Sequence, residues 1–257
     1  MLRSNPRFIT GLYLILLLPL LVSCSAKVKS IETDPSFTND ELMNTRICIL
    51  GCTSIAVENP DDMMLSNWLS NELRNAMLDK IEGIDVMPFG DVRRAAGERL
   101  MMQCLQEIHD YGSIDPPILD ELAKELTNEV KYAVAHRIET DQVEFGEDEV
   151  KENEVVTGYT LKTKRKITAT FYVYDLQQSK RVCLATIEGN SETKRQITEE
   201  ERVDTGDGIL GAVVDIVDII FSDDEDDRIE NFPPPPNQDV VMRHIYNKFS
   251  EELPKKK

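Results

Sequence analysis

The chain has 257 residues, of which 41% are hydrophobic, and a formal net charge of −18 from 47 acidic and 29 basic side chains. A chain of this length and hydrophobicity can bury a core, which excludes a disordered tail, and its acidic field repels phosphate backbones, which argues against nucleic-acid binding. The most apolar stretch, Phe8 to Val22, is shorter than the roughly 20 residues of a membrane-spanning helix, so it is predicted to be a signal and not a spanning segment.

Residues 1–23 have the features of an export signal. Arg3 and Arg7 give a basic start, an apolar run follows, and Pro19 breaks any helix just before small residues. The run ends in the tetrapeptide LVSC at 21–24, which resembles the lipobox of bacterial lipoproteins. The resemblance implies cleavage between Ser23 and Cys24, so that Cys24 becomes the first residue of the mature chain.

In that family the cysteine is a diacylglyceryl thioether and carries further acyl chains such as palmitate. Several acyl chains hold a protein on a membrane effectively permanently, whereas a single chain binds only marginally. The resemblance also implies an outer-membrane, periplasm-facing location, because Ser25 and not an aspartate follows Cys24. We therefore expect a lipid-anchored envelope protein.

The polar segment 24–45 lacks an apolar stripe or alternation and is predicted to be a flexible tether, with the folded domain at 46–195. Alternating and strand-length apolar runs predict strands at 46–52, 84–89, 132–143, 155–161, 166–174 and 181–191. Helical spacings and caps predict helices at 59–83, 91–111 (weakened at Gly97 and stopped by Gly112) and 115–126. The charged segment 145–154 is predicted to be a solvated loop.

This order predicts an α/β (α+β) fold: a mixed sheet of βαβα(α)βββ order packed with helices, with C-terminal helices added. A strand–helix–strand crossover implies parallel neighbours, whereas the later strands form an antiparallel hairpin. In that hairpin Ile167, Ala169, Phe171 and Val173 are expected on one face of the sheet, and Thr168, Thr170, Tyr172 and Tyr174 on the other.

The pattern resembles the domain shared by the amino-terminal part of TolB, the curli-secretion lipoprotein CsgG and the penicillin-binding-protein activator LpoB. The resemblance covers residues 46–191 and rests on the segments ICILG, LSNWLSNELRNAM, IDVMPF, LDELAKEL, VKYAVA and TATFYVYDLQQSKRVCLATIEG. It departs from CsgG, whose pore needs amphipathic hairpins where the charged segment 145–154 stands here, and from LpoB, whose stalk is longer.

Residues 196–257 are predicted to form a C-terminal helical extension. A helix is expected at 209–221, then the acidic run 223–227, a stiff spacer at Pro233–Pro236 and a terminal helix. The terminal helix has one apolar side, made of Val241, Met242, Ile245, Phe249 and Leu253. The pattern leaves open whether each helix packs on its own domain or on a partner.

The motifs of catalysis and cofactor binding are incomplete. The string Gly206 to Gly211 fits a dinucleotide fingerprint by letters, but no buried strand precedes it. The acidic run 223–227 lacks the glycine turn and distal acid of a calcium loop, and the cysteines and histidines lack zinc spacings. Cys48 and Cys52 are four apart on one strand, too far for a disulfide, and are predicted to be core residues.

The three histidines are His109 at a helix end, His136 in a strand and His244 in the last helix, and no nucleophile is predicted beside any of them. We expect no catalytic residue, metal or cofactor. The resulting hypothesis is a non-catalytic envelope lipoprotein that serves as an accessory or assembly module for a protein partner. The alternatives are a subunit of a CsgG-like secretion channel, a small-ligand-binding lipoprotein and a degraded enzyme.

Overall fold

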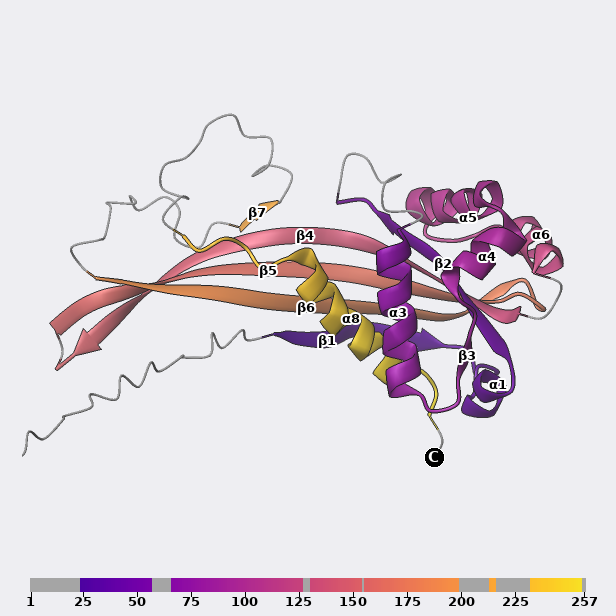
Figure 1. Ribbon diagram of the computed structural model, residues 1–257, viewed down its shortest axis with the longest axis horizontal. Helices are drawn as coiled ribbons and strands as arrows, with labels where there is room; N and C mark the ends of the chain where they lie inside the picture. Colours follow the sequence, from indigo (N-terminus) through magenta and orange to yellow (C-terminus); the bar gives the residue numbers. More distant parts are fainter. Residues whose placement is uncertain are drawn as a thin grey trace, which may run out of the picture.

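The computed structural model describes residues 24–56, 66–126, 130–153, 155–198, 213–215 and 232–255. It is an α+β fold, as predicted: one curled, mixed sheet with the strand order β1-β6-β5-β4-β2-β3, and β7 added beside β4. The helices gather at one end, while three long strands continue past them as an arm (Figure 1).

The strands are β1 Ser25–Thr33, β2 Arg46–Ser54, β3 Asp85–Val86, β4 Val130–Glu152, β5 Val155–Asp175, β6 Lys180–Thr198 and β7 Val213–Asp215. The described helices are α1 Asn39–Met43, α3 Asn67–Lys80, α4 Phe89–Ala96, α5 Glu98–Tyr111, α6 Pro116–Glu125 and α8 Gln238–Glu252.

The parallel half of the sheet agrees with the prediction. β2 pairs in parallel with both β3 and β4, and the crossovers carry α3 and then α4 to α6. The predicted stripe of α3 is buried at Leu69, Leu73, Met77 and Ile81. The Ser66 hydroxyl caps this helix by accepting a hydrogen bond from the Leu69 N–H at 3.3 Å. The helix start predicted at residues 59–60 lies outside the described residues.

The predicted helix at 91–111 is two helices. Gly97 has φ +75, a backbone conformation that L side chains rarely adopt, and it separates α4 from α5. Gly112 ends α5 in the left-handed conformation, as predicted. The strand predicted at 84–89 is shorter, because Phe89 begins α4.

The antiparallel half is longer than predicted. β4 continues through the segment 145–152, so the prediction of a solvated loop there is wrong. Part of its charge is neutralised: Lys162 of β5 forms an ion pair with Asp148, and the Lys151 ammonium of β4 itself lies 2.7 Å from the Glu149 carboxylate. Cross-strand pairs of opposite charge stabilise a sheet, so a charged segment can form a strand here.

The prediction of a flexible tether at 24–45 is also wrong. Residues 25–33 form β1, which pairs antiparallel with β6. The following turn is held by the Lys180 ammonium, 2.9 Å from the Asp34 carboxylate, and Phe37 and Leu42 are buried in the core. Most side chains of the edge strand β1 are exposed. Its sequence therefore lacks the alternation of apolar and polar residues by which a strand is predicted.

The two larger hydrophobic cores of the described residues lie on opposite faces of the sheet, and a smaller cluster lies on the arm. On the first, called the α8 face, α3 and α8 cover the predicted set Ile167, Ala169, Phe171 and Val173. On the second, called the α5 face, α4 to α6 pack on Tyr172 and Tyr174. Cys48 and Cys52 are buried, in line with the prediction of core residues, but on different faces, because the register shifts between Ile49 and Gly51.

The C-terminal segment returns to the domain. The whole predicted apolar side of α8 is buried: Val241, Met242, Ile245, Phe249 and Leu253. Gly189 of β6 permits this approach, since a Cβ there would lie 2.6 Å from the Ile245 Cγ1 atom. The terminal helix is therefore a core helix of its own chain.

The proline segment before α8 lies on the arm and is not a free spacer. The Thr193 hydroxyl donates a hydrogen bond to the Pro234 carbonyl at 2.7 Å. The centroids of the Phe232 and Phe145 rings are 5.2 Å apart. Within the helix predicted at 209–221, residues Val213–Asp215 are instead a strand paired with β4. The rest of that helix, the acidic run 223–227 and the string 206–211 lie outside the described residues.

Candidate functional site

The predicted lipid-attachment residue stands directly at the start of the sheet. Cys24 is the residue before β1, and its Sγ atom lies 3.1 Å from the Ser191 Oγ atom of β6. Ser23, the other half of the predicted cleavage site, lies outside the described residues. A lipid on Cys24 would therefore connect to a paired strand without an intervening tether.

A group of lysines surrounds one carboxylate close to Cys24. The Glu188 carboxylate of β6 receives the Lys27 ammonium at 2.7 Å and the Lys29 ammonium at 2.9 Å, while the Lys166 ammonium lies at 3.6 Å. Burial alone would raise the pKa of Glu188, but the lysine hydrogen bonds and charges outweigh it and lower that pKa to about 2. Glu188 therefore stays ionised at neutral pH, with three cations around it.

The histidines singled out in the sequence are not brought together. His136 is fully buried, and its Nε2 atom lies 2.8 Å from the Tyr246 hydroxyl of α8. His109 lies on α5, 2.7 Å from the Asp110 carboxylate, and His244 lies on α8, where burial lowers its pKa. The three histidines thus lie on three different elements, and His136 and His109 have different partners.

The cysteines other than Cys24 are buried thiols. Burial raises the pKa of Cys104 to about 12 and that of Cys183 to about 11, and it also raises the pKa values of Cys48 and Cys52. A protonated thiol is a poor nucleophile and metal ligand. Within the described ranges, no three His, Cys, Asp or Glu side chains gather as a metal-ligand group.

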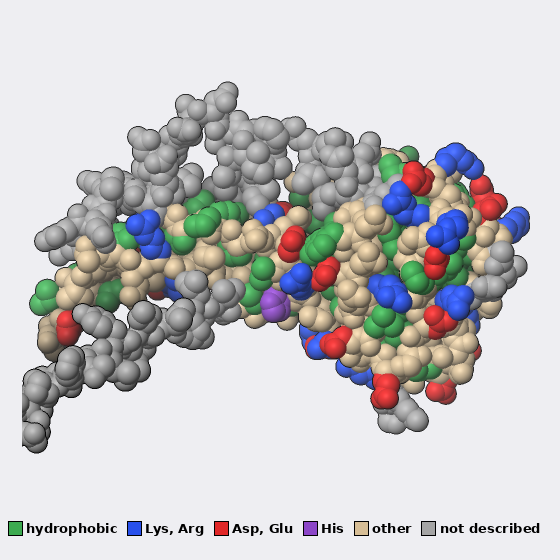
Figure 2. Space-filling model, viewed as in Figure 1, with side chains coloured by type: hydrophobic (Ala, Val, Ile, Leu, Met, Phe, Trp, Pro, Cys, Tyr) green, Lys and Arg blue, Asp and Glu red, His purple; other side chains and the backbone are tan. Residues whose placement is uncertain are grey.

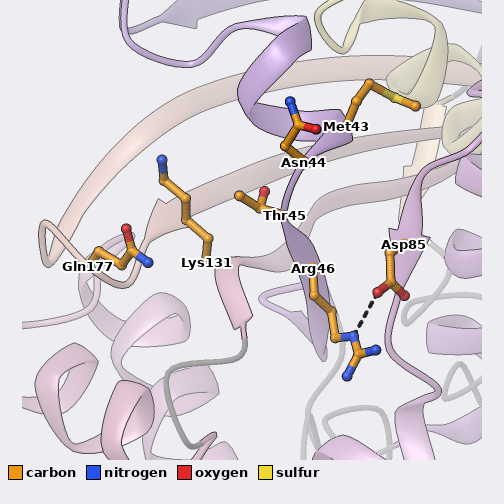
Figure 3. A pocket seen from close by; sticks show the side chains of 7 residues that line it. All are labelled: Met43, Asn44, Thr45, Arg46, Asp85, Lys131 and Gln177. Atoms are coloured by element: carbon orange, nitrogen blue, oxygen red, sulfur yellow. Dashed lines mark hydrogen bonds and ion pairs between the residues drawn. The ribbon is translucent and has the colours of Figure 1, made fainter.

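A polar hollow of about 710 Å³ lies at the amino ends of β2 and β4 (Figure 3). Its charged side chains are engaged in ion pairs: the Arg46 Nε atom lies 2.8 Å from the Asp85 carboxylate, and Lys131 pairs with Glu41 of α1 beside the hollow. Ligands of parallel sheets bind at the carboxyl ends of strands. The hollow therefore lies at the opposite end from the usual ligand position.

Two charged clusters were missed by the sequence reasoning. One is the Glu188 group, and the other is the buried pair in which the Arg165 Nε atom donates to the Asp141 carboxylate at 2.8 Å. Both need partners on different strands, so no spacing along the chain reveals them. The sequence signal that could have indicated the Glu188 group is the alternation of side chains along β5 and β6. It places Lys166 and Glu188 on the same face of the sheet, the α5 face.

Within the part of the chain that the structure describes, no helix has the length and apolarity to cross a membrane. The surface over α3 and α8 carries acidic and basic side chains interspersed, with neither sign dominating the helical end (Figure 2). This surface shows no concentration of one charge.

The chain matches no model of a known protein family and no curated protein sequence. Among solved structures it is similar to the PelC dodecamer of Paraburkholderia phytofirmans, with 10% identity and a TM-score of 0.31 over 69% of this chain and 85% of that one. It is also similar to the hypothetical protein CT253 of Chlamydia trachomatis, with 13% identity and a TM-score of 0.32 over 62% and 76% of the two chains. Similarities at this level indicate neither the family nor the function of this chain.

Proposed function

We propose that this chain is a lipid-anchored, non-catalytic protein of the bacterial outer membrane, facing the periplasm, and that it serves as an accessory or assembly module for another envelope protein. The observation that carries the proposal is the LVSC tetrapeptide at the end of an apolar run, followed at once by the first strand of a folded domain. An acyl anchor at this point holds the whole sheet against the membrane surface.

The surroundings of the titratable residues support the non-catalytic part of the proposal. His136 is buried against Tyr246, and the thiols of Cys48 and Cys52 are enclosed in the two cores. Catalytic acids, bases and nucleophiles need access to substrate and a neighbouring partner group. These side chains are instead buried, and they help to pack the sheet against its helices.

Replacing Cys24 tests the anchor. We expect Cys24→Ala to accumulate as unprocessed precursor, because the resemblance assigns the acylated thioether and the new amino terminus to this residue. The measurement is the intact mass of the protein extracted from membranes, with Ser25→Ala as the control that keeps the cysteine. An unchanged mature mass in the variant, or a wild-type protein without lipid, would contradict the anchor.

Crosslinking in intact cells tests the module. A photoreactive residue is placed at Tyr111 on α5, which is 74% exposed, and at Val155 at the tip of the arm, which is 65% exposed. Both positions leave the buried cores intact. We expect one of them to capture a single heterologous envelope protein, identified by mass, while cells that are not irradiated give no captured species.

A second candidate is a subunit of a CsgG-like secretion channel. It is favoured by one finding: within the segment 145–154, predicted to be a loop, residues 145–152 are a paired strand of the arm. In that case the same crosslinkers would yield a ladder of self-crosslinked species that resists detergent. Absence of any captured protein, together with turnover of a cell-wall substrate by the purified chain, would contradict both candidates.

A further inference from the structure

The sheet presents a face of six lysines beside the predicted anchor. On the arm and β1, alternation places lysines of β5 and β6 on the α5 face, and the Lys27 and Lys29 side chains reach the same face through Glu188. We call this set the lysine face; its members are Lys27, Lys29, Lys162, Lys164, Lys166 and Lys194. The described helices of the α5 face pack further along the sheet, over Tyr172 and Tyr174.

The face has a positive excess on a strongly acidic chain. Among the residues that the structure describes, the carboxylates paired with these lysines are Glu144, Asp148, Glu188 and Glu192, so six lysines oppose four acids. The chain as a whole carries −18. An anionic surface would therefore repel the rest of the molecule and attract this face, and this difference would orient the protein.

The lysines lie close to the point of attachment. With about 3.3 Å per residue along a strand and about 4.8 Å between strands, Lys27 stands about 10 Å from Cys24 and the other members stand within about 20 Å. Because β1 is paired with β6, the chain has no flexible linker that could carry this face away from the membrane. Acyl chains inserted at Cys24 would bring lipid headgroups within reach of the lysine side chains.

We propose that the lysine face binds the anionic headgroups of phospholipids in the leaflet that holds the Cys24 anchor, and thereby fixes the orientation of the sheet on the membrane. The inference deepens the proposed function and rests on its lipid anchor. Each lysine near an anionic membrane surface contributes about 1 kcal/mol to binding, or about a fivefold change in affinity. Contributions of this size matter when several act together with an acyl anchor.

The test uses the chain beginning at Cys24, made without lipid, which contains all of the described elements. Binding is measured by flotation with vesicles of phosphatidylcholine, either pure or with one-third phosphatidylglycerol. We expect at least tenfold tighter binding to the phosphatidylglycerol vesicles, reduced by added salt because salt screens exposed charges.

Matched variants separate this face from total charge. The triple variant Lys162→Gln/Lys164→Gln/Lys194→Gln should weaken binding at least tenfold, since it removes half of the lysines. It spares the cations around the buried Glu188, so the fold should be retained, as checked by thermal melting. The control Lys80→Gln/Lys124→Gln/Lys248→Gln removes the same charge from α3, α6 and α8 and should leave binding unchanged.

A variant that removes acidic side chains from the lysine face completes the test. Glu144→Gln/Glu192→Gln raises the positive excess of the face and should tighten binding to the anionic vesicles, a result that simple damage to the fold would not give. Equal binding to both vesicle types, equal effects of the two triple variants, or a dimer in solution that the lysine-face variant dissociates would overturn the proposal. The mass of the native Cys24 peptide reports on the anchor separately, so the two inferences fail by different measurements.

Discussion

Phe249→Ala should lower the free energy of unfolding by about 3 to 5 kcal/mol, the usual cost of truncating a fully buried aromatic side chain. The Phe249 ring is completely buried and stacks on the Phe171 ring of β5, with 4.1 Å between centroids and 9° between planes. Because α8 covers the sheet at this point, the lost contacts lie in the centre of the first core. Urea denaturation followed by circular dichroism gives the free energy.

Arg243→Ala is the matched control on the same helix. Its guanidinium lies 2.7 Å from the Glu72 carboxylate of α3 in an ion pair that is largely exposed on the arginine side. Pairs of this kind contribute only about 0.2 to 1 kcal/mol, so the control should stay close to the wild type. A loss below 1 kcal/mol in Phe249→Ala would contradict a core role and restore the alternative in which this helix docks on a partner.

The elements predicted well are those with a complete signal in their own residues. α3 shows its buried stripe at regular spacing, and α5 ends where Gly112 provides the left-handed conformation. In β5, residues 167–174 alternate between the two faces of the sheet, with Phe171 and Val173 in one core and Tyr172 and Tyr174 in the other. In each case the local pattern alone selects the element, since propensity and burial agree.

The elements predicted wrongly depend on partners that are distant in the chain. β1 has few buried side chains and becomes a strand through the backbone of β6. Residues 145–152 become strand through the backbone of β5, which also supplies Lys162 as the partner of Asp148. A charged segment reads as a loop when its neighbours are unknown. The same reason hid the lysine face, which is assembled from three strands.

The sequence of α8 alone does not decide whether this helix packs on its own domain or on a partner protein. The apolar side of α8 fits either reading, and what decides is the surface that receives it. Gly189 leaves the space on β6 into which Ile245 fits. A single glycine within a strand marks a close approach, but its partner cannot be named until the fold is known.

His136 should make the protein less stable as the pH falls below 6.5, the ordinary pKa of a histidine side chain. Burial lowers the pKa of His136 from 6.5 to about 3, an effect that the Gly51 backbone partly opposes. Above pH 6.5 the histidine is neutral in both folded and unfolded chains, so its contribution to stability is fully present. Below pH 6.5 the unfolded chain binds a proton that the folded chain does not, and the free energy of unfolding falls with pH.

The expected slope is about 1.4 kcal/mol per pH unit, continuing toward pH 3. Glu188 adds a loss only at lower pH, because its lowered pKa contributes stability that is present above its ordinary value of 4.5 and is lost toward pH 2. Between pH 6 and pH 5, His136 should therefore contribute to the slope before Glu188 does, and His244, whose pKa burial also lowers, contributes in the same direction.

His136→Gln removes the titration and keeps a polar group that can meet the Tyr246 hydroxyl. Between pH 6 and pH 5 the variant should lose the slope that comes from one proton, whatever its absolute stability. The control Tyr111→Ala, at an exposed position of α5 that keeps all three histidines, should retain the wild-type slope. Urea denaturation at several pH values measures both. A slope in His136→Gln equal to that of the wild type would show that the neutral, buried histidine between β4 and α8 is not the group that makes the fold sensitive to acid.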